Sequence, residues 1–176
     1  MTPEEAFAAH YARLTGLARR LVDPATAEEV AADAIAKLDD APVADRGDAD
    51  VAAWLNRVTV NAALNRIRSR QREQARVAVH GRSVDPTPDD TPDVVADRHE
   101  TQDRVRAVLA ELPDRQATAL LLRHSGHPYA EIAATLGVAE GSVGVLLARG
   151  ERAFRRRWED PTTADPAAAD PAAGDR

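Results

Sequence analysis

Cysteine is absent from this 176-residue chain, and aromatic residues are scarce, with two each of Trp, Tyr and Phe. Without cysteine, the chain can form no disulfide framework, cysteine-based metal site or cysteine nucleophile. It also has no run of about eighteen apolar residues and no basic-plus-apolar segment at its N-terminus. We therefore expect a soluble cytoplasmic protein with no membrane insertion.

Runs of strand-forming residues are missing as well, whereas apolar residues recur at spacings of three and four, as amphipathic helices require. This pattern predicts an all-α fold without a sheet. A first helix is predicted over 3–21. Its core face should hold five residues at helical spacing: Phe7, Tyr11, Leu14, Ala18 and Leu21.

The next segment, Thr26-Ala-Glu-Glu29, has the form of a capping box, which predicts a second helix with Thr26 at its N-cap. Glu29 and Asp33 lie four residues apart on the polar face of this helix. A loop should follow over 39–48, because those residues have turn chemistry and no periodicity. A long third helix is predicted from about Asp50 to Arg76.

The third helix carries a polar stripe between two apolar flanks. At about 100° per residue, four side chains share this stripe: Arg57, Asn61, Asn65 and Arg68. Guanidinium and amide groups suit contacts with phosphates and base edges. The alternative is a solvated polar face. Residues 51–82 contain seven basic residues and one acidic residue, which favours the nucleic-acid interpretation, because solvated helices usually mix both signs.

Two segments cannot bury a core. Residues 80–98 combine three prolines with five aspartates, and residues 159–176 repeat alanine, aspartate and proline. We therefore predict two small helical domains, over 1–78 and 100–158, joined by a flexible acidic linker over 79–99 and followed by a disordered tail over 159–176. The domains should be able to sit apart on one partner. In the second domain, Asp114 is the expected cap of a helix that continues through Leu122.

A helix-turn-helix is predicted over 129–143. Small Ala133 would let two helices approach, Gly137 would turn the chain, and Val143 would close the local core. The second helix should begin near Ala139 or Glu140 and present its outward residues to a DNA major groove. An ordinary corner between two helices is the alternative. DNA binding is compatible with the net charge of −6, because attraction to phosphate is local and the second basic segment, 112–158, has a net charge of +3.

Three stretches together resemble the extracytoplasmic-function sigma factors of bacterial RNA polymerase. Residues 26–38 resemble the polymerase-clamp helix of that family, residues 53–68 resemble its promoter-melting helix, and 112–116 with 129–138 resemble its upstream-element domain. The resemblance implies a factor that binds RNA polymerase core and directs it to promoter DNA. Anti-sigma factors are common partners in the family, so one is a further expected partner.

The resemblance also implies roles for individual residues. Glu29 and Asp33 would bind the polymerase clamp. The stripe on the third helix, Arg57, Asn61, Asn65 and Arg68, would contact the downstream promoter element and the melted strand. Upstream readout would fall to Ser142, Arg149 and Arg152. The family usually has a basic residue soon after position 143, where this chain has Gly144-Val145-Leu146-Leu147. That apolar surface could instead pack against another protein or the first domain.

Two other functions compete with this interpretation. A stand-alone helix-turn-helix regulator would bind DNA as a dimer but would leave the polar stripe without a role. A sigma-like protein could bind polymerase or a regulator without directing initiation. An enzyme is not expected, because the chain has no Gly-rich phosphate loop and no recognisable catalytic arrangement, and no cofactor is implied. His124 and His127 have metal-like spacing but no other ligands nearby in sequence, so we expect no metal site.

Overall fold

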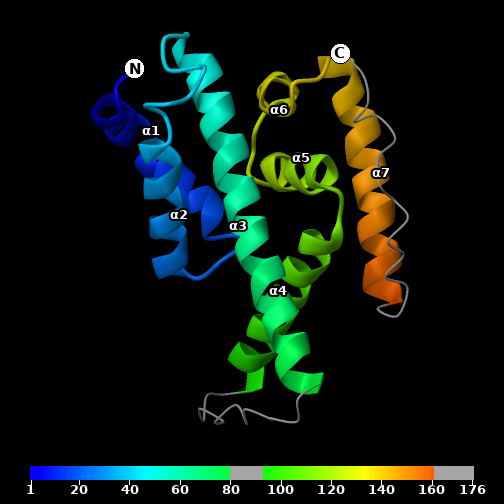
Figure 1. The fold of residues 1–176 in the computed structure, drawn as a ribbon. Helices are drawn as coiled ribbons and strands as arrows, with labels where there is room; N and C mark the ends of the chain where they lie inside the picture. Colours follow the sequence, from blue (N-terminus) through cyan, green and yellow to red (C-terminus); the bar gives the residue numbers. More distant parts are fainter. Residues whose placement is uncertain (80–92, 161–176) are drawn as a thin grey trace.

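The computed structural model describes residues 1–79 and 93–160. The described residues contain α-helices and no strand, which confirms the all-α prediction. The helices are α1 (Pro3–Ala18), α2 (Pro24–Ala36), α3 (Asp48–Val79), α4 (Asp93–Glu111), α5 (Asp114–His124), α6 (Tyr129–Leu136) and α7 (Glu140–Glu159). Figure 1 shows α3 as the central helix, with α1 and α2 on one side and α5, α6 and α7 on the other.

Side-chain caps set the starts of the first two helices. At α1, the hydroxyl of Thr2 accepts from the backbone N–H of Glu5, and the Glu5 carboxylate accepts from the N–H of Thr2, which completes a capping box. At α2, the predicted cap at Thr26 is wrong. Asp23 is the N-cap, since its carboxylate accepts from the Thr26 N–H at 3.0 Å. The Asp23-Pro24 pair favours this earlier start, because Asp is a strong N-cap residue and Pro suits the first helical position.

The core face of α1 differs from the predicted stripe at its start. Phe7 is 49% exposed and stacks on Tyr11, with ring centroids 4.3 Å apart, whereas Ala6 is fully buried. Ala6 packs in a cluster with Val51 and Leu55 of α3. Because successive helical residues differ by about 100°, burial of Ala6 turns Phe7 towards solvent. Farther along α1, the prediction agrees with the structure at Leu14, Ala18 and, just beyond the helix, Leu21, all of which are buried.

The second helical unit begins earlier than the sequence indicated. Helix α4 starts at Asp93, so residues 93–99 of the expected linker are helical. Residues 80–92 of that linker and 161–176 of the expected tail lie outside the described residues. The expected cap of α5 is also wrong. Pro113 occupies the N-cap, and Asp114 lies in the first turn, where its carboxylate accepts a hydrogen bond from Arg68 of α3 instead.

The predicted helix-turn-helix is confirmed in its local geometry. Gly137 adopts a left-handed conformation, with φ of 64°, immediately after α6. Helix α7 begins at Glu140, Ala133 is buried, and Val143 is fully buried between the helices. The left-handed turn follows α6 directly because glycine adopts positive φ without a steric penalty.

The two helical units share one apolar core. Val60 and Leu64 of α3 belong to the same buried cluster as Ile132 and Leu136 of α6. This differs from the picture of two domains that sit apart. The apolar residues on the two flanks of α3 belong to two different buried clusters. One flank packs on the first unit, and α6 covers the other.

Among the described helices, none is both long and apolar enough to cross a membrane alone. Only α6 and α7 taken together pass on length and composition, and the pair is bent by 86°.

Candidate nucleic-acid interface

The polar stripe of α3 is partly open to solvent. Arg57 and Asn65 are exposed, whereas Asn61 and Arg68 are half-buried. The structure therefore brings the four predicted residues to one side of α3 but gives them different surroundings. Three of them lie along the open part of the stripe, and Arg68 lies at its end next to α4 and α5.

The guanidinium of Arg68 is held by the junction between α4 and α5. Its Nε donates to the carbonyl oxygen of Ala110 at 2.7 Å. Its Nη2 donates to the Asp114 carboxylate at 2.7 Å and to the carbonyl oxygen of Leu112 at 3.3 Å. On the remaining side, Nη1 lies 3.4 Å from Oδ1 of Asn65. The residue predicted to contact DNA thus binds a distant part of its own chain in this conformation.

Glu29 and Asp33 occupy the exposed face of α2, as predicted. The carboxylate of Glu29, however, forms an ion pair with Arg66 of α3. Arg66 was not among the predicted site residues, because its partner is 37 positions away in the sequence. Asp33 is therefore the clearer candidate for an intermolecular contact on this face.

The outward surface of α7 is mixed in character. The three residues predicted to read DNA, Ser142, Arg149 and Arg152, are all exposed. Between them, Val145 is 53% exposed, while Leu147 is buried and contributes to the core of the second unit. The expected apolar surface of this helix therefore consists mainly of Val145. This surface therefore presents one valine side chain together with a hydroxyl and two guanidinium groups.

A buried polar cluster that the sequence did not reveal anchors the start of α3. His10 and Asn56 are nearly fully buried. Arg13 donates to Oδ1 of Asn56 at 2.6 Å, and Nε2 of His10 lies 3.2 Å from Oδ1 of Asp48. Burial lowers the pKa of the Arg13 guanidinium, and the carboxylates of Glu131 and Asp48 oppose that effect. The spacing of His10 and Arg13 within an apolar helix face was the available signal.

The carboxylate of Glu131, on α6, raises the pKa of the Arg13 guanidinium on α1 although the two residues belong to different helical units. Glu131 also lies 2.7 Å from Nδ1 of His127, so this histidine has a carboxylate partner within its own unit. His124 is exposed. In the described parts of the chain, no group of three or more His, Cys, Asp or Glu residues could hold a metal ion.

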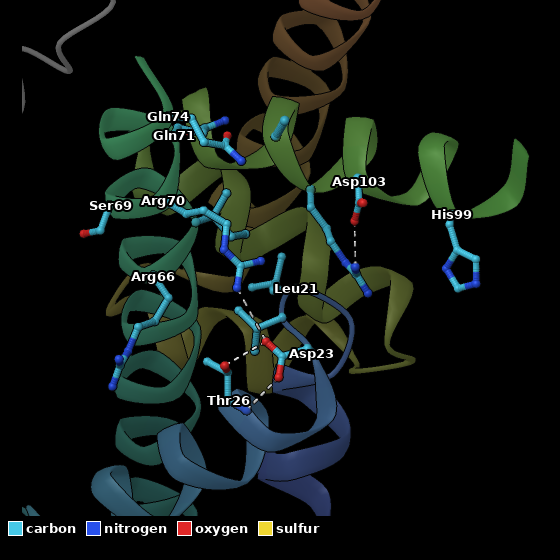
Figure 2. A pocket seen from close by; sticks show the side chains of 14 residues that line it. Leu21, Asp23, Thr26, Arg66, Ser69, Arg70, Gln71, Gln74, His99 and Asp103 are labelled. Atoms are coloured by element: carbon cyan, nitrogen blue, oxygen red, sulfur yellow. Dashed lines mark hydrogen bonds and ion pairs between the residues drawn. The ribbon is translucent and has the colours of Figure 1, made fainter. Parts of the chain in front are cut away.

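Where the two helical units meet, the α1–α2 turn, α3 and α4 line an open pocket of about 680 Å³. Figure 2 shows Arg70 directed towards Asp23, which also binds Thr26, while Asp103 and His99 line the opposite wall. Hydrogen bonds from the Thr26 backbone and hydroxyl hold the pKa of Asp23 below its usual value. Among the charged groups that line the pocket, Asp23 pairs with Arg70 and Asp103 pairs with Arg106.

Two family models match the chain in the order of its two helical units. Sigma-70 region 2 matches residues 6–73, and sigma-70 region 4 matches residues 102–154. The chain belongs to the sigma-70 family. The first match covers α1 to α3, including the polar stripe. The second begins within α4 and includes the helix-turn-helix.

Individual relatives agree with this assignment. The chain is 36% identical over 112 residues to the ECF RNA polymerase sigma factor SigM from two strains of Mycobacterium tuberculosis, Erdman and H37Rv. This match covers 63% of the chain and 53% of each relative, so the chain spans about half the length of the curated relatives it matches. Among solved structures, it is similar to the sigma factor RpoE in complex with the anti-sigma factor NepR from Bartonella quintana. That similarity has 20% identity and a TM-score of 0.49, and it covers 89% of this chain and 96% of that one.

Proposed function

We propose that this protein is a sigma factor that binds RNA polymerase core and directs it to promoter DNA. The observation that supports the proposal is the succession of the two sigma-70 matches on the two helical units of one chain. The first unit carries the arginine–asparagine stripe on α3, and the second carries a helix-turn-helix. A free-standing regulator would need only the second unit.

The first unit, α1 to α3, binds the polymerase clamp and the downstream promoter element in this proposal. Asp33, with Glu29 beside it, contacts the clamp. Arg57, Asn61, Asn65 and Arg68 contact the opened strand, where guanidinium and amide groups can bind phosphates and unstacked bases. Melting of this kind derives its free energy from binding, so we assign the chain no catalytic step and no cofactor.

The second unit, α4 to α7, reads the upstream element through Ser142, Arg149 and Arg152. The proposed site of action is the cytoplasm, where polymerase and DNA are found. We include an anti-sigma factor among the proposed partners on the basis of the family resemblance alone.

The test is in vitro transcription with purified core polymerase and genomic DNA fragments from the same source. New start sites that share spaced upstream and downstream elements would support the proposal. If core binds the protein and no start appears, the protein is a sigma-like binding protein instead. The exposed Val145 on the recognition helix is the observation that favours this second candidate. Failure to bind core would overturn both and leave the free-standing regulator.

Two variants separate the proposed contacts. Arg57→Glu places a negative charge on the open part of the stripe, so promoter opening should fail while core binding is retained. Asp33→Arg reverses the charge of the exposed α2 face, so core binding should weaken. A native gel with core polymerase and permanganate footprinting of melted thymines measure the two activities separately. Equal loss of both activities in either variant would contradict these separate roles.

A further inference from the structure

Arg68 of α3 caps the C-terminal end of α4 at the α4–α5 junction. Ala110 lies at the C-terminal end of α4, and Leu112 follows that end directly. Carbonyl groups there have no intrahelical donor, and the helix dipole is negative at this end. The guanidinium of Arg68 reaches both carbonyl groups and adds the Asp114 carboxylate. A residue of the first unit thereby caps a helix of the second.

A second contact between the units has the reverse arrangement. Arg106 of α4 donates from Nε to the carbonyl oxygen of Arg20 at 3.3 Å and from Nη2 to that of Arg19 at 3.5 Å. Arg19 is the C-cap of α1. Each unit therefore supplies an arginine to the end of a helix in the other.

We propose that these contacts define a closed state in which the α4–α5 junction competes with DNA for Arg68. A guanidinium binds phosphate through the same N–H groups that Arg68 presents to the Ala110 carbonyl and the Asp114 carboxylate. The two uses therefore exclude each other. Separation of the units frees Arg68 and, with it, the side of Asn65 that it contacts. The DNA half of this inference rests on the proposed function, whereas the closed state does not.

The exposure of the Arg68–Asp114 pair, which we call the latch, determines how strongly it stabilises the closed state. The side chain of Asp114 is 57% exposed and that of Arg68 is 28% exposed, so the pair is partly open to solvent. Such pairs contribute modestly, and neutralising Asp114 should raise the ratio of open to closed molecules roughly twofold to fivefold. Asp114→Lys replaces attraction by repulsion and should raise it further.

Single-molecule energy transfer on the full chain measures this ratio. Because the protein has no cysteine, Ala9→Cys on α1 and Arg155→Cys on α7 provide two unique dye positions, both exposed. Asp114→Asn and Asp114→Lys are introduced into this labelled background. Glu140→Gln and Glu140→Lys are the matched controls, since Glu140 is likewise an exposed acidic residue in the first turn of a helix of the second unit. They reproduce the change in charge and helix dipole without touching α3.

The second readout is affinity for a fluorescent single-stranded DNA of mixed sequence, about 20 nucleotides long, which binds through phosphates and stacking. When only open molecules bind, the apparent Kd falls in proportion to the gain in open fraction. In the Asp114 variants, we expect the apparent Kd to fall in proportion to the gain in open fraction. This fall should exceed any change in the Glu140 variants. An unchanged open fraction in both Asp114 variants would contradict the claim that the Arg68–Asp114 pair stabilises the closed state.

An increase in open fraction without tighter DNA binding would overturn the competition for Arg68. The remaining outcome concerns the proposed function. If no variant binds DNA while the Asp114 variants open, the DNA role of α3 fails and the closed state stands.

Discussion

The left-handed turn at Gly137 gives the sharpest prediction about stability. Its φ is 64° and its ψ is 42°, and its backbone N–H donates to carbonyl groups at the end of α6. A methyl group built at this position meets no atom within 4 Å. Gly137→Ala therefore tests conformation alone. A non-glycine residue in this conformation costs roughly 1–2 kcal/mol, so we expect the free energy of unfolding to fall by about 1 kcal/mol or slightly more.

Gly144 provides the matched control within the same motif. It lies inside α7, and a methyl group there also meets no atom within 4 Å. Because alanine favours a helix over glycine by about 0.5–1 kcal/mol, Gly144→Ala should stabilise the protein. One substitution at two glycines should thus change stability in opposite directions.

Urea unfolding followed by circular dichroism measures both variants. The two free energies should differ by roughly 2 kcal/mol, with the wild type between them. In thermal unfolding, each 1 kcal/mol corresponds to a shift of about 2–4 °C in Tm for a chain of this size. A Gly137→Ala protein as stable as the wild type would refute the left-handed turn, and so would two shifts of the same sign.

Three further substitutions probe the shared core, a cap and the buried cluster. Leu64→Ala should lower the free energy of unfolding by about 2–5 kcal/mol in urea, and a loss well below that range would contradict burial of Leu64 between the two units. Asp23→Ala should lower Tm near neutral pH. The lowered pKa of Asp23 means that its stabilisation is present above its unfolded-state pKa, so the difference in Tm should disappear as the pH falls through the folded-state pKa, and a constant difference would contradict this. Arg13→Ala should cost about 1–3 kcal/mol in urea, because it leaves the buried amide of Asn56 without its donor, and a neutral effect would show that water replaces Arg13.

Local features were the most predictable from the sequence. Gly137, Ala133 and Val143 lie within a few residues of each other, so spacing alone determines how two short helices must meet. Asp23 shows where such reasoning fails, because two adjacent capping signals compete. Thr26 with Glu29 has the formal capping pattern, but Asp23 followed by Pro24 starts the helix earlier.

Contacts between the units were not predictable in the same way. The sequence shows that α3 has an apolar flank at Val60 and Leu64, but periodicity does not identify which helix covers it. The three partners of Arg68 in the second unit are even harder to predict. Two of them are backbone carbonyl groups, which any residue possesses, and the third, Asp114, is 46 positions away.

The partners of the arginines on α3 change the interpretation of the charge distribution along the sequence. The scarcity of acidic residues in 51–82 favoured a nucleic-acid face, because helices in solvent usually carry their own ion pairs. In the fold, distant acidic residues supply those pairs: Glu29 meets Arg66, Asp114 meets Arg68, and Asp23 meets Arg70. The basic segment is therefore partly neutralised within the chain. Exposed pairs of this kind contribute only about 0.2–1 kcal/mol each, so a DNA phosphate can replace a carboxylate at little cost. Of these three pairs, only that of Asp114 with Arg68 lies on the stripe that the proposed function assigns to DNA, so Asp114 would act as an exchangeable occupant of that surface.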